Sequence, residues 1–397
     1  MTLAPKVIIG NPPWVTNSEL GAIKARNIPA KSNIKALSGL DAKTGKSNFD
    51  IGEFVLLRLL ELFAGRRGCF AMLCKNSIIK NIVEALPQRQ FRVSNVRALE
   101  IDARREFGAA VEASLLVMDI GMPTASSICR VSTLAQPTYV SRTFGWARNK
   151  LMSNIDEPHL DLDGTSPLIW RQGLKHDCAR VMELDTRNGV LMNGSGEVAD
   201  IEEQEVYWLL KSSDLRTFEV TQARKKVIVT QRRIGEDTTA LRQKAPRLWE
   251  YLTRNSVLLD KRKSSIYHNK PRFSIFGVGE YTFKPYKVAI SGLYKEPCFS
   301  IVSPFDDRPV ILDDTCYLLG FDTYLAALFT ASILNSFIVK QFLTSIVFSD
   351  AKRPYTKEIL MRIDLAKAAK HLSLHELQAY WDEHGYLPRV TIHDSDL

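Results

Sequence analysis

The fold is decided by a short stretch near the start of the chain, Val7-Ile8-Ile9-Gly10-Asn11-Pro12-Pro13-Trp14. An apolar, β-branched run followed by glycine and two prolines predicts a buried strand that ends abruptly at the edge of a sheet. Neither proline has an N–H, so neither can extend a ladder or a helix. We therefore predict a stiff loop that presents an amide side chain, bare carbonyl groups and an indole between Asn11 and Trp14.

These groups suit the methylation of an exocyclic amino group. Such an NH2 is a poor nucleophile, because its lone pair is delocalised into the base. The Asn11 side-chain oxygen and the Pro12 carbonyl can each accept a hydrogen bond from it and stabilise the charge that develops on nitrogen. Trp14 offers a flat face on which a base can stack after it leaves a duplex. The competing interpretation is an ordinary strand-to-turn connection with the aromatic ring in the core.

The loop Asn11-Pro12-Pro13-Trp14 resembles the catalytic loop of amino-group methyltransferases that use S-adenosylmethionine. The resemblance is closest to the adenine-specific DNA methyltransferases of restriction–modification systems. It implies that the loop is catalytic, that the adenine is flipped, and that methyl transfer to N6 is direct. Glu106-Phe107-Gly108 resembles the segment whose aromatic ring stacks on the flipped base opposite Trp14. A core position for Phe107 and an N4-cytosine target both remain open.

Composition narrows the class of partner. A chain of 397 residues with 45% hydrophobic residues is long enough for two or three domains. The net charge of +9 and a pI near 9.1 favour an anionic partner. With no apolar run of 18 residues and no signal peptide, we expect nucleic acid rather than membrane as that partner, and a cytoplasmic protein. No CxxC pair is present, and His371 with His375 lacks further ligands, so we expect no metal site.

The first third of the chain has an α/β pattern. Apolar residues at helical spacing predict helices over 53–63 and 77–91, and apolar runs predict strands over 69–73, 93–101 and 113–120. This order resembles the C-terminal half of a Rossmann-like methyltransferase sheet. The fold class that we predict is therefore α/β, with this half sheet followed by a mixed α+β target-recognition domain.

The cofactor half of such a sheet would contain a glycine-rich turn and an acidic residue for the ribose. Gly194-Ser195-Gly196 and Gly277-Val278-Gly279 lack the strand–turn–helix context of that turn, so the cofactor-binding residues stay unassigned. We expect a separate N-terminal methyltransferase polypeptide to supply most of the S-adenosylmethionine site. The non-enzymatic alternative is a DNA-binding specificity module, or an inactive fragment, without a methyl donor.

Changes in composition and the resemblance suggest four regions. We predict a partial catalytic domain over 1–122, a proline-containing linker over 123–165, a target-recognition domain over 166–365, and a charged helical tail over 366–397. The third region resembles bacterial adenine methyltransferases at Trp170-Arg171-Gln172-Gly173, at Asp313-Asp314-Thr315-Cys316-Tyr317 and around Asn335-Ser336.

Residues 221–275 carry fourteen Lys and Arg against four acidic residues, a net charge of +10. Trp249, Tyr251, Tyr267 and Phe273 are interleaved with them, as in surfaces that follow phosphates and reach bases. A solvated charged face is the alternative interpretation. Our candidate residues for binding double-stranded DNA are Arg224, Lys225, Lys226, Arg232, Arg233, Lys261, Arg262, Lys263 and, further on, Lys284.

The leading hypothesis from sequence is a site-specific adenine-N6 DNA methyltransferase. Methylation of an RNA base or of a protein glutamine uses similar loops and is the second enzymatic alternative. No convincing PD…(D/E)xK nuclease pattern is present in the sequence. We therefore expect a restriction endonuclease as a separate partner.

Overall fold

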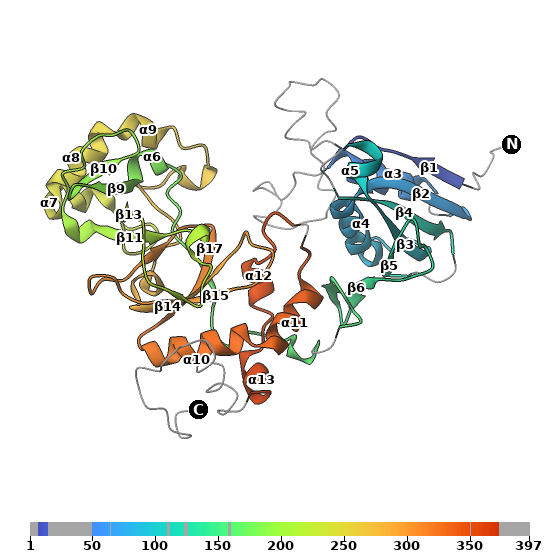
Figure 1. Ribbon diagram of the computed structural model, residues 1–397. Helices are drawn as coiled ribbons and strands as arrows, with labels where there is room; N and C mark the ends of the chain where they lie inside the picture. The colour runs from blue at the N-terminus through green and yellow to red at the C-terminus, as the bar shows by residue number, and fades with distance from the viewer. Residues whose placement is uncertain are drawn as a thin grey trace. The chain divides into compact units, whose positions relative to one another are not determined.

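The computed structural model describes residues 7–14, 50–63, 65–108, 112–122, 126–157, 160–349 and 351–372. The chain forms two compact units (Figure 1). The first contains residues 1–158 and 344–351, and the second contains residues 159–343 and 352–397. Each unit has its own hydrophobic core.

The first unit is built on a mixed, seven-stranded sheet with the strand order β1-β2-β4-β3-β5-β6-β7. Strands β1 and β2 are parallel, as are β3 and β5, and the remaining neighbours are antiparallel. The strands are β1 Val7–Gly10, β2 Gly68–Lys75, β3 Val93–Ile101, β4 Ala113–Ile120, β5 Ile128–Thr133, β6 Arg142–Ala147 and β7 Lys150–Met152. The strands predicted over 93–101 and 113–120 are confirmed, and the α/β class with them.

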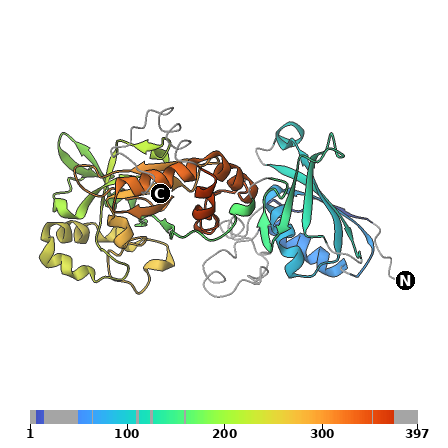
Figure 2. The same cartoon turned by 90° about the horizontal axis from the view of Figure 1, so that it is seen from below.

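Helices α3 (Ile51–Phe63) and α4 (Asn76–Gln88) share one hydrophobic core with this sheet, and α5 (Ala103–Phe107) is a single short turn. In α4 the residues Ile78, Ile79, Ile82, Val83 and Leu86 are buried, which is one face of a helix. At about 2 kcal/mol for each fully buried aliphatic side chain, this face supplies a large part of the stability of the unit. Figure 2 shows the same elements from below, with α3 and α4 in blue.

The strand before the Asn-Pro-Pro-Trp loop is less buried than its sequence suggests. Val7 and Ile9 are 60% and 76% exposed, whereas Ile8 is half-buried and packs against the core of the unit. Strand β1 lies at the end of the strand order and pairs with β2, so only one of its faces packs. The prediction of a buried strand is therefore corrected to a half-exposed edge strand.

Residues 128–152, which fall in the predicted linker over 123–165, form β5, β6 and β7 of the same sheet. These strands are only six, six and three residues long and are separated by polar turns, so they leave no long apolar period in the sequence. The linker prediction is corrected accordingly. Of the predicted tail over 366–397, the structure describes the end of α13 (Leu365–Lys370), and residues 373–397 lie outside the described part.

The second unit contains two five-stranded sheets, with the orders β10-β9-β13-β11-β16 and β12-β15-β14-β17-β8. The first sheet is made of β9 Glu183–Arg187, β10 Val190–Asn193, β11 Val206–Leu210, β13 Lys225–Ile228 and β16 Ile311–Leu312. The second is made of β8 Arg171–Gln172, β12 Glu219–Val220, β14 Tyr286–Ser291, β15 Phe299–Val302 and β17 Cys316–Phe321. The helices α6 Ala179–Met182, α7 Leu241–Lys244, α8 Pro246–Arg254 and α9 Ser256–Asp260 surround the first sheet (Figure 1).

Helix α10 (Tyr324–Asn335) packs on β14, β15 and β17, and α11 (Phe337–Ile346) follows after a bend at Ser336. Buried Asn335 fastens α10 to β15, because its amide accepts from the Phe299 N–H and donates to the Phe299 carbonyl. Among the described helices, none is by itself long and apolar enough to cross a membrane. The bent pair α10–α11 meets the criterion together by length and composition only. Helix α12 (Lys357–Leu360) precedes α13.

Candidate functional site

The Asn-Pro-Pro-Trp loop begins where β1 ends. Because β1 and β2 are parallel, with Gly10 opposite Met72, the loop leaves the sheet at the end of β2 that carries Lys75. The Asn11 side chain is exposed, whereas Pro12 is buried. The amide is therefore open to an incoming group, while the proline next to it is held in the protein interior.

Lys75 fixes the far end of this loop. Its Nζ donates to the Trp14 carbonyl oxygen over 2.9 Å and pairs with Asp50 Oδ2 at 3.0 Å. Asp50 Oδ1 accepts from the Gly52 N–H, in the first turn of α3, over 2.9 Å. A Cβ atom on Gly52 would lie 3.4 Å from the Pro13 carbonyl oxygen, so the helix and the loop approach closely. We call this pair the Lys75–Asp50 clamp, because it joins the loop, the start of α3 and the end of β2.

Both members of the clamp are largely removed from water, with side-chain exposures of 21% for Lys75 and 12% for Asp50. A nearby pair braces the helices behind them, since Asn81 Nδ2 of α4 donates to Glu53 Oε2 of α3 over 2.7 Å. Glu53 is itself buried, and a charge-assisted hydrogen bond of this kind stabilises a carboxylate in the interior. The loop is therefore supported by elements with fixed polar contacts.

The two predicted stacking residues are described to different extents. Trp14 is half-buried, and its indole N–H is buried without a hydrogen-bond partner among the described residues. The ring is therefore held by packing and by its own backbone, which the clamp fixes. Phe107 is the last residue of α5, but its side chain lies outside the described part of the structure. Its stacking role stays a prediction.

Several of the nine candidate DNA-binding residues are already engaged within the second unit. The Arg262 guanidinium donates to the carbonyl oxygens of Leu259, Ser274 and His176 and lies 3.8 Å from the centre of the Tyr267 ring. The structure therefore gives Arg262 an internal bracing role that its place in a basic run does not reveal. Four other candidates pair with acidic side chains in this unit: Arg224 with Asp214, Lys225 with Asp185, Arg232 with Glu205, and Lys284 with Asp322.

The remaining candidates differ from these. Arg233, Lys261 and Lys263 are exposed and have no ion pair within the part of the chain that the structure describes. The Lys226 ammonium group lies 4.5 Å from the centre of the Trp208 ring. These four are the candidates whose charge is most available to an outside anion.

A layer of stacked guanidinium and aromatic groups lies beside this basic set. The Arg232 guanidinium is 4.7 Å from the ring centre of Phe283 and 5.3 Å from that of Tyr207, and its Nη1 donates to the Tyr207 hydroxyl. The Arg308 guanidinium lies 4.3 Å from the same Tyr207 ring and donates to the Gln204 carbonyl over 2.9 Å. Arg308 and Tyr207 are remote from the basic run in sequence, so composition alone does not group them with it.

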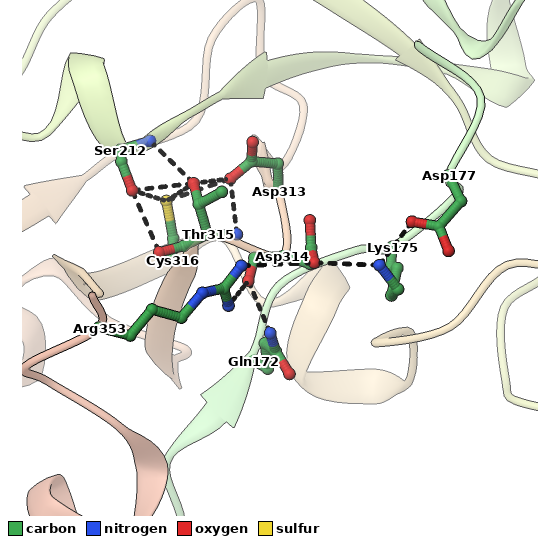
Figure 3. A network of polar contacts seen from close by, with 9 residues as sticks. All are labelled: Gln172, Lys175, Asp177, Ser212, Asp313, Asp314, Thr315, Cys316 and Arg353. Carbon is green, nitrogen blue, oxygen red and sulfur yellow. Dashed lines mark hydrogen bonds and ion pairs between the residues drawn. The ribbon is translucent and has the colours of Figure 1, made fainter. Parts of the chain in front are cut away.

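The Asp-Asp-Thr-Cys-Tyr motif forms the turn into β17 and is a hub of polar contacts (Figure 3). The Asp314 carbonyl accepts from Gln172 Nε2 at 2.6 Å and from Arg353 Nη1 at 3.0 Å. Asp314 Oδ2 lies 3.3 Å from Lys175 Nζ. Thr315 donates its N–H to Asp313 Oδ1 over 3.0 Å. The motif thus ties together segments more than a hundred residues apart, which is a structural role.

Within the described residues, no three His, Cys, Asp or Glu side chains are grouped as a metal site would need.

The glycine pairs behave as turns. Gly196 follows β10, and Gly277 precedes the 3-10 turn η6 (Glu280–Phe283); both have positive φ, and neither follows a strand of the seven-stranded sheet. The described residues therefore show no glycine-rich cradle for a cofactor in the first unit.

Comparison with known proteins gives one close relative, although no family model matches the chain. The type II methyltransferase M.NspV from Nostoc sp. (strain ATCC 29411 / PCC 7524) is 40% identical over 367 residues, which are 92% of this chain and 76% of the relative. The chain belongs to the type II methyltransferase family.

Solved structures of restriction–modification enzymes overlap with this methyltransferase chain at low similarity. The type IIL enzyme MmeI in complex with DNA has 12% sequence identity and a TM-score of 0.49, covering 90% of this chain and 45% of MmeI. A DrdV–DNA complex has 11% identity and a TM-score of 0.41, covering 80% of this chain and 36% of DrdV.

Sequence reasoning found the loop of this methyltransferase but not its clamp. Lys75 is 61 residues from Trp14 and 25 residues from Asp50 in the chain. A lysine at a strand end carries no signal of its own in the sequence. The signal that could have identified Lys75 is the parallel pairing of two strands. When the first strand is followed by the loop, the end of the second strand lies beside that loop.

Proposed function

We propose that this chain methylates the N6 amino group of adenine in double-stranded DNA, as part of a restriction–modification system, with S-adenosylmethionine as the donor. The observation that carries the proposal is the exposed Asn11 amide on a clamped Asn-Pro-Pro-Trp loop, in a chain of the type II methyltransferase family.

The acceptor chemistry follows from the loop. The Asn11 side-chain oxygen and the Pro12 carbonyl accept hydrogen bonds from the adenine NH2, which draws its lone pair away from the ring. As the methyl group is transferred, positive charge develops on N6, and the two carbonyl dipoles stabilise it. Trp14 stacks on the flipped base and sets its height above the loop.

The Lys75–Asp50 clamp limits electrostatic repulsion between Lys75 and the reacting base in this mechanism. A lone ammonium group beside the loop would oppose the positive charge that develops on the adenine nitrogen. Asp50, 3.0 Å from Lys75 Nζ, neutralises that ammonium group while leaving its hydrogen bond to the Trp14 carbonyl intact. Lys75 therefore acts as a positioning residue that fixes the loop without adding net charge to it.

The donor would supply an electrophilic methyl group when bound. The described residues do not provide the glycine-rich turn that usually holds S-adenosylmethionine, so no donor-binding residue is assigned to them. In this proposal the donor pocket lies outside the described residues, on this chain or on an N-terminal methyltransferase polypeptide that acts with it. A partner restriction endonuclease would cleave the same DNA when it is unmethylated.

Substitution of the loop amide tests the proposal. The protein, together with the N-terminal methyltransferase polypeptide where transfer requires it, is incubated with labelled S-adenosylmethionine and unmethylated genomic DNA, and methylated positions are mapped by sequencing. Asn11→Ala should lower the transfer rate by about 10²- to 10³-fold, because it removes one of two dipoles from the transition state. DNA affinity should change by no more than a few-fold.

The matched control is Gln88→Ala, which removes an exposed amide of α4 in the same unit and should leave transfer unchanged. Full activity in Asn11→Ala would contradict the assigned catalytic role. N4-methylcytosine as the mapped product would overturn adenine as the target, and methyl groups found only in RNA or protein would overturn the DNA substrate.

A further inference from the structure

A sharp turn in the second unit exposes an arginine and an isoleucine at its tip. It lies between β13 and the 3-10 turn η4 (Thr238–Ala240). The Glu236 N–H donates to the Arg233 carbonyl over 3.2 Å, and Gly235 has a φ of +80°. This is the pattern of a turn with glycine at its third position. Arg233 is exposed, and Ile234 is 55% exposed, so the tip presents a cationic and an apolar side chain next to each other in the chain.

The turn is braced from below. Glu236 Oε2 accepts from the backbone N–H groups of Arg232, at 2.6 Å, and of Arg233, at 3.2 Å. Gln231, which is buried, donates its amide to the Glu236 carbonyl over 2.5 Å and accepts from the Ile275 N–H over 2.8 Å. A tip held in this way loses little conformational entropy when it meets a partner.

The surroundings of the tip carry charges of both signs. The Arg232 and Arg308 guanidinium groups stack on the Tyr207 ring, and Arg232 is also paired with Glu205. Arg233 is exposed and has no ion pair among the described residues. Glu236, the nearest acid in sequence, directs a carboxylate oxygen to two backbone N–H groups. An isoleucine on a rigid turn, next to an arginine without an ion pair among the described residues, fits a polyanion with an apolar interior, and stacked base pairs between phosphates have this chemistry.

We propose that the turn Arg233–Glu236 enters a groove of duplex DNA, with Ile234 as a wedge at one base step and Arg233 on a neighbouring phosphate. Apolar side chains inserted at a base step partly unstack it and bend the duplex. Such a wedge offsets part of the unstacking that base flipping requires. The inference rests on the proposed DNA substrate and adds the residue that opens the duplex.

The experiment first selects duplexes that the wild-type protein binds from a random pool, and then places 2-aminopurine at each position of the selected site. Fluorescence rises where a base is unstacked. Ile234→Ala should reduce that rise and weaken binding roughly tenfold, the effect of about 1.4 kcal/mol. A mismatch at the same step should restore its affinity to within about twofold of wild type, because the step is already unstacked.

Arg233→Met separates the charge from the wedge. It should lower the slope of log affinity against log salt by about 0.9, the value for one phosphate contact, and keep the fluorescence rise. The matched control is Ile169→Ala, since Ile169 is also 55% exposed and lies in the same unit. All three substituted side chains are exposed, so each variant should fold. Circular dichroism checks this before binding is measured.

The outcomes separate the two proposals. If no duplex is enriched, the DNA substrate itself fails, and the wedge fails with it. If duplexes are enriched and Ile234→Ala binds and unstacks them like the wild type, the wedge alone is overturned. An equal loss in Ile169→Ala, or a loss in Ile234→Ala that no mismatch restores, also overturns it, because a general apolar contact would then explain the effect.

Discussion

Replacing Lys287 with methionine should stabilise the second unit and remove much of its dependence on pH. Lys287 lies in β14, between Val302 of β15 and Gly320 of β17, and its side chain is fully buried. Its Nζ donates to the Lys284 carbonyl oxygen over 2.5 Å. Burial lowers the pKa of Lys287 from its ordinary 10.5 to about 7, because the protein interior disfavours the charged amine.

The direction in which stability changes with pH follows from the protons bound by Lys287 in the folded and unfolded states. The unfolded chain keeps the lysine proton up to pH 10.5, whereas the folded protein keeps it only below about 7. Between these values folding releases a proton, so stability rises with pH by about 1.4 kcal/mol per unit, to a total on the order of 5 kcal/mol. Near pH 8 methionine removes a deprotonation cost of roughly 3 kcal/mol and loses a hydrogen bond of about 1 kcal/mol. The net gain should be roughly 2 kcal/mol.

The assay is urea unfolding at pH 7, 8 and 9. Because two units can unfold in separate steps, cleavage of the second unit by a protease is followed alongside fluorescence. Lys270→Met is the control, since Lys270 is exposed in the same unit and its loss should leave the pH slope unchanged. If Lys287→Met keeps the slope of the wild type, Lys287 does not titrate in this range and the reasoning is refuted.

Two further pairs of substitutions test the loop and the second unit. Lys75→Met should lower kcat at least about tenfold with DNA affinity unchanged, because the loop loses its anchor. In single-turnover kinetics Asp50→Asn should add little to that loss, since the pair acts as a unit; additive losses would argue against the clamp. Gly277→Ala should lower the free energy of unfolding by well over about 1 kcal/mol, because φ is +66° and the new Cβ would lie 2.1 Å from the Gly173 carbonyl. Gly235→Ala, at φ +80° with open space around it, should lower it by only about 1 kcal/mol in the same urea titration, and equal losses would exclude the clash.

The strands and helices around the first core could be predicted because each contains a continuous or helical apolar pattern. The expected strands over 93–101 and 113–120 coincide with β3 and β4. The short strands β5 to β7 could not be predicted in this way. Their polar turns hide the alternation, and they are stabilised by pairing within the sheet, β5 with β3, β6 with β5 and β7 with β6, rather than by local pattern.

The candidate site shows the same division between local and long-range information. Asn11 and Pro12 can be proposed from four consecutive residues, since the proposed chemistry needs only the Asn11 side chain and the Pro12 backbone. The partners of Trp14 are not recognisable, because Lys75 and Asp50 reach the loop only through the parallel pairing of β1 with β2 and the start of α3. The side-chain position of Phe107 lies outside what the structure describes, so its role stays a prediction.

The net charge of the basic run does not show how many of its cations are free to bind an outside anion. The basic run predicts an anionic partner, but the Arg262 guanidinium already donates hydrogen bonds to three carbonyl oxygens. Arg232 already donates to Glu205 and Tyr207. A charge that is already paired gains little from a phosphate, because the new contact must replace an existing one. In the proposed DNA complex, the electrostatic attraction therefore falls on the cations that have no ion pair among the described residues. Among these, Arg233 alone is followed in the chain by an exposed isoleucine on a braced turn, which is why specificity for an unstacked base step is best sought there.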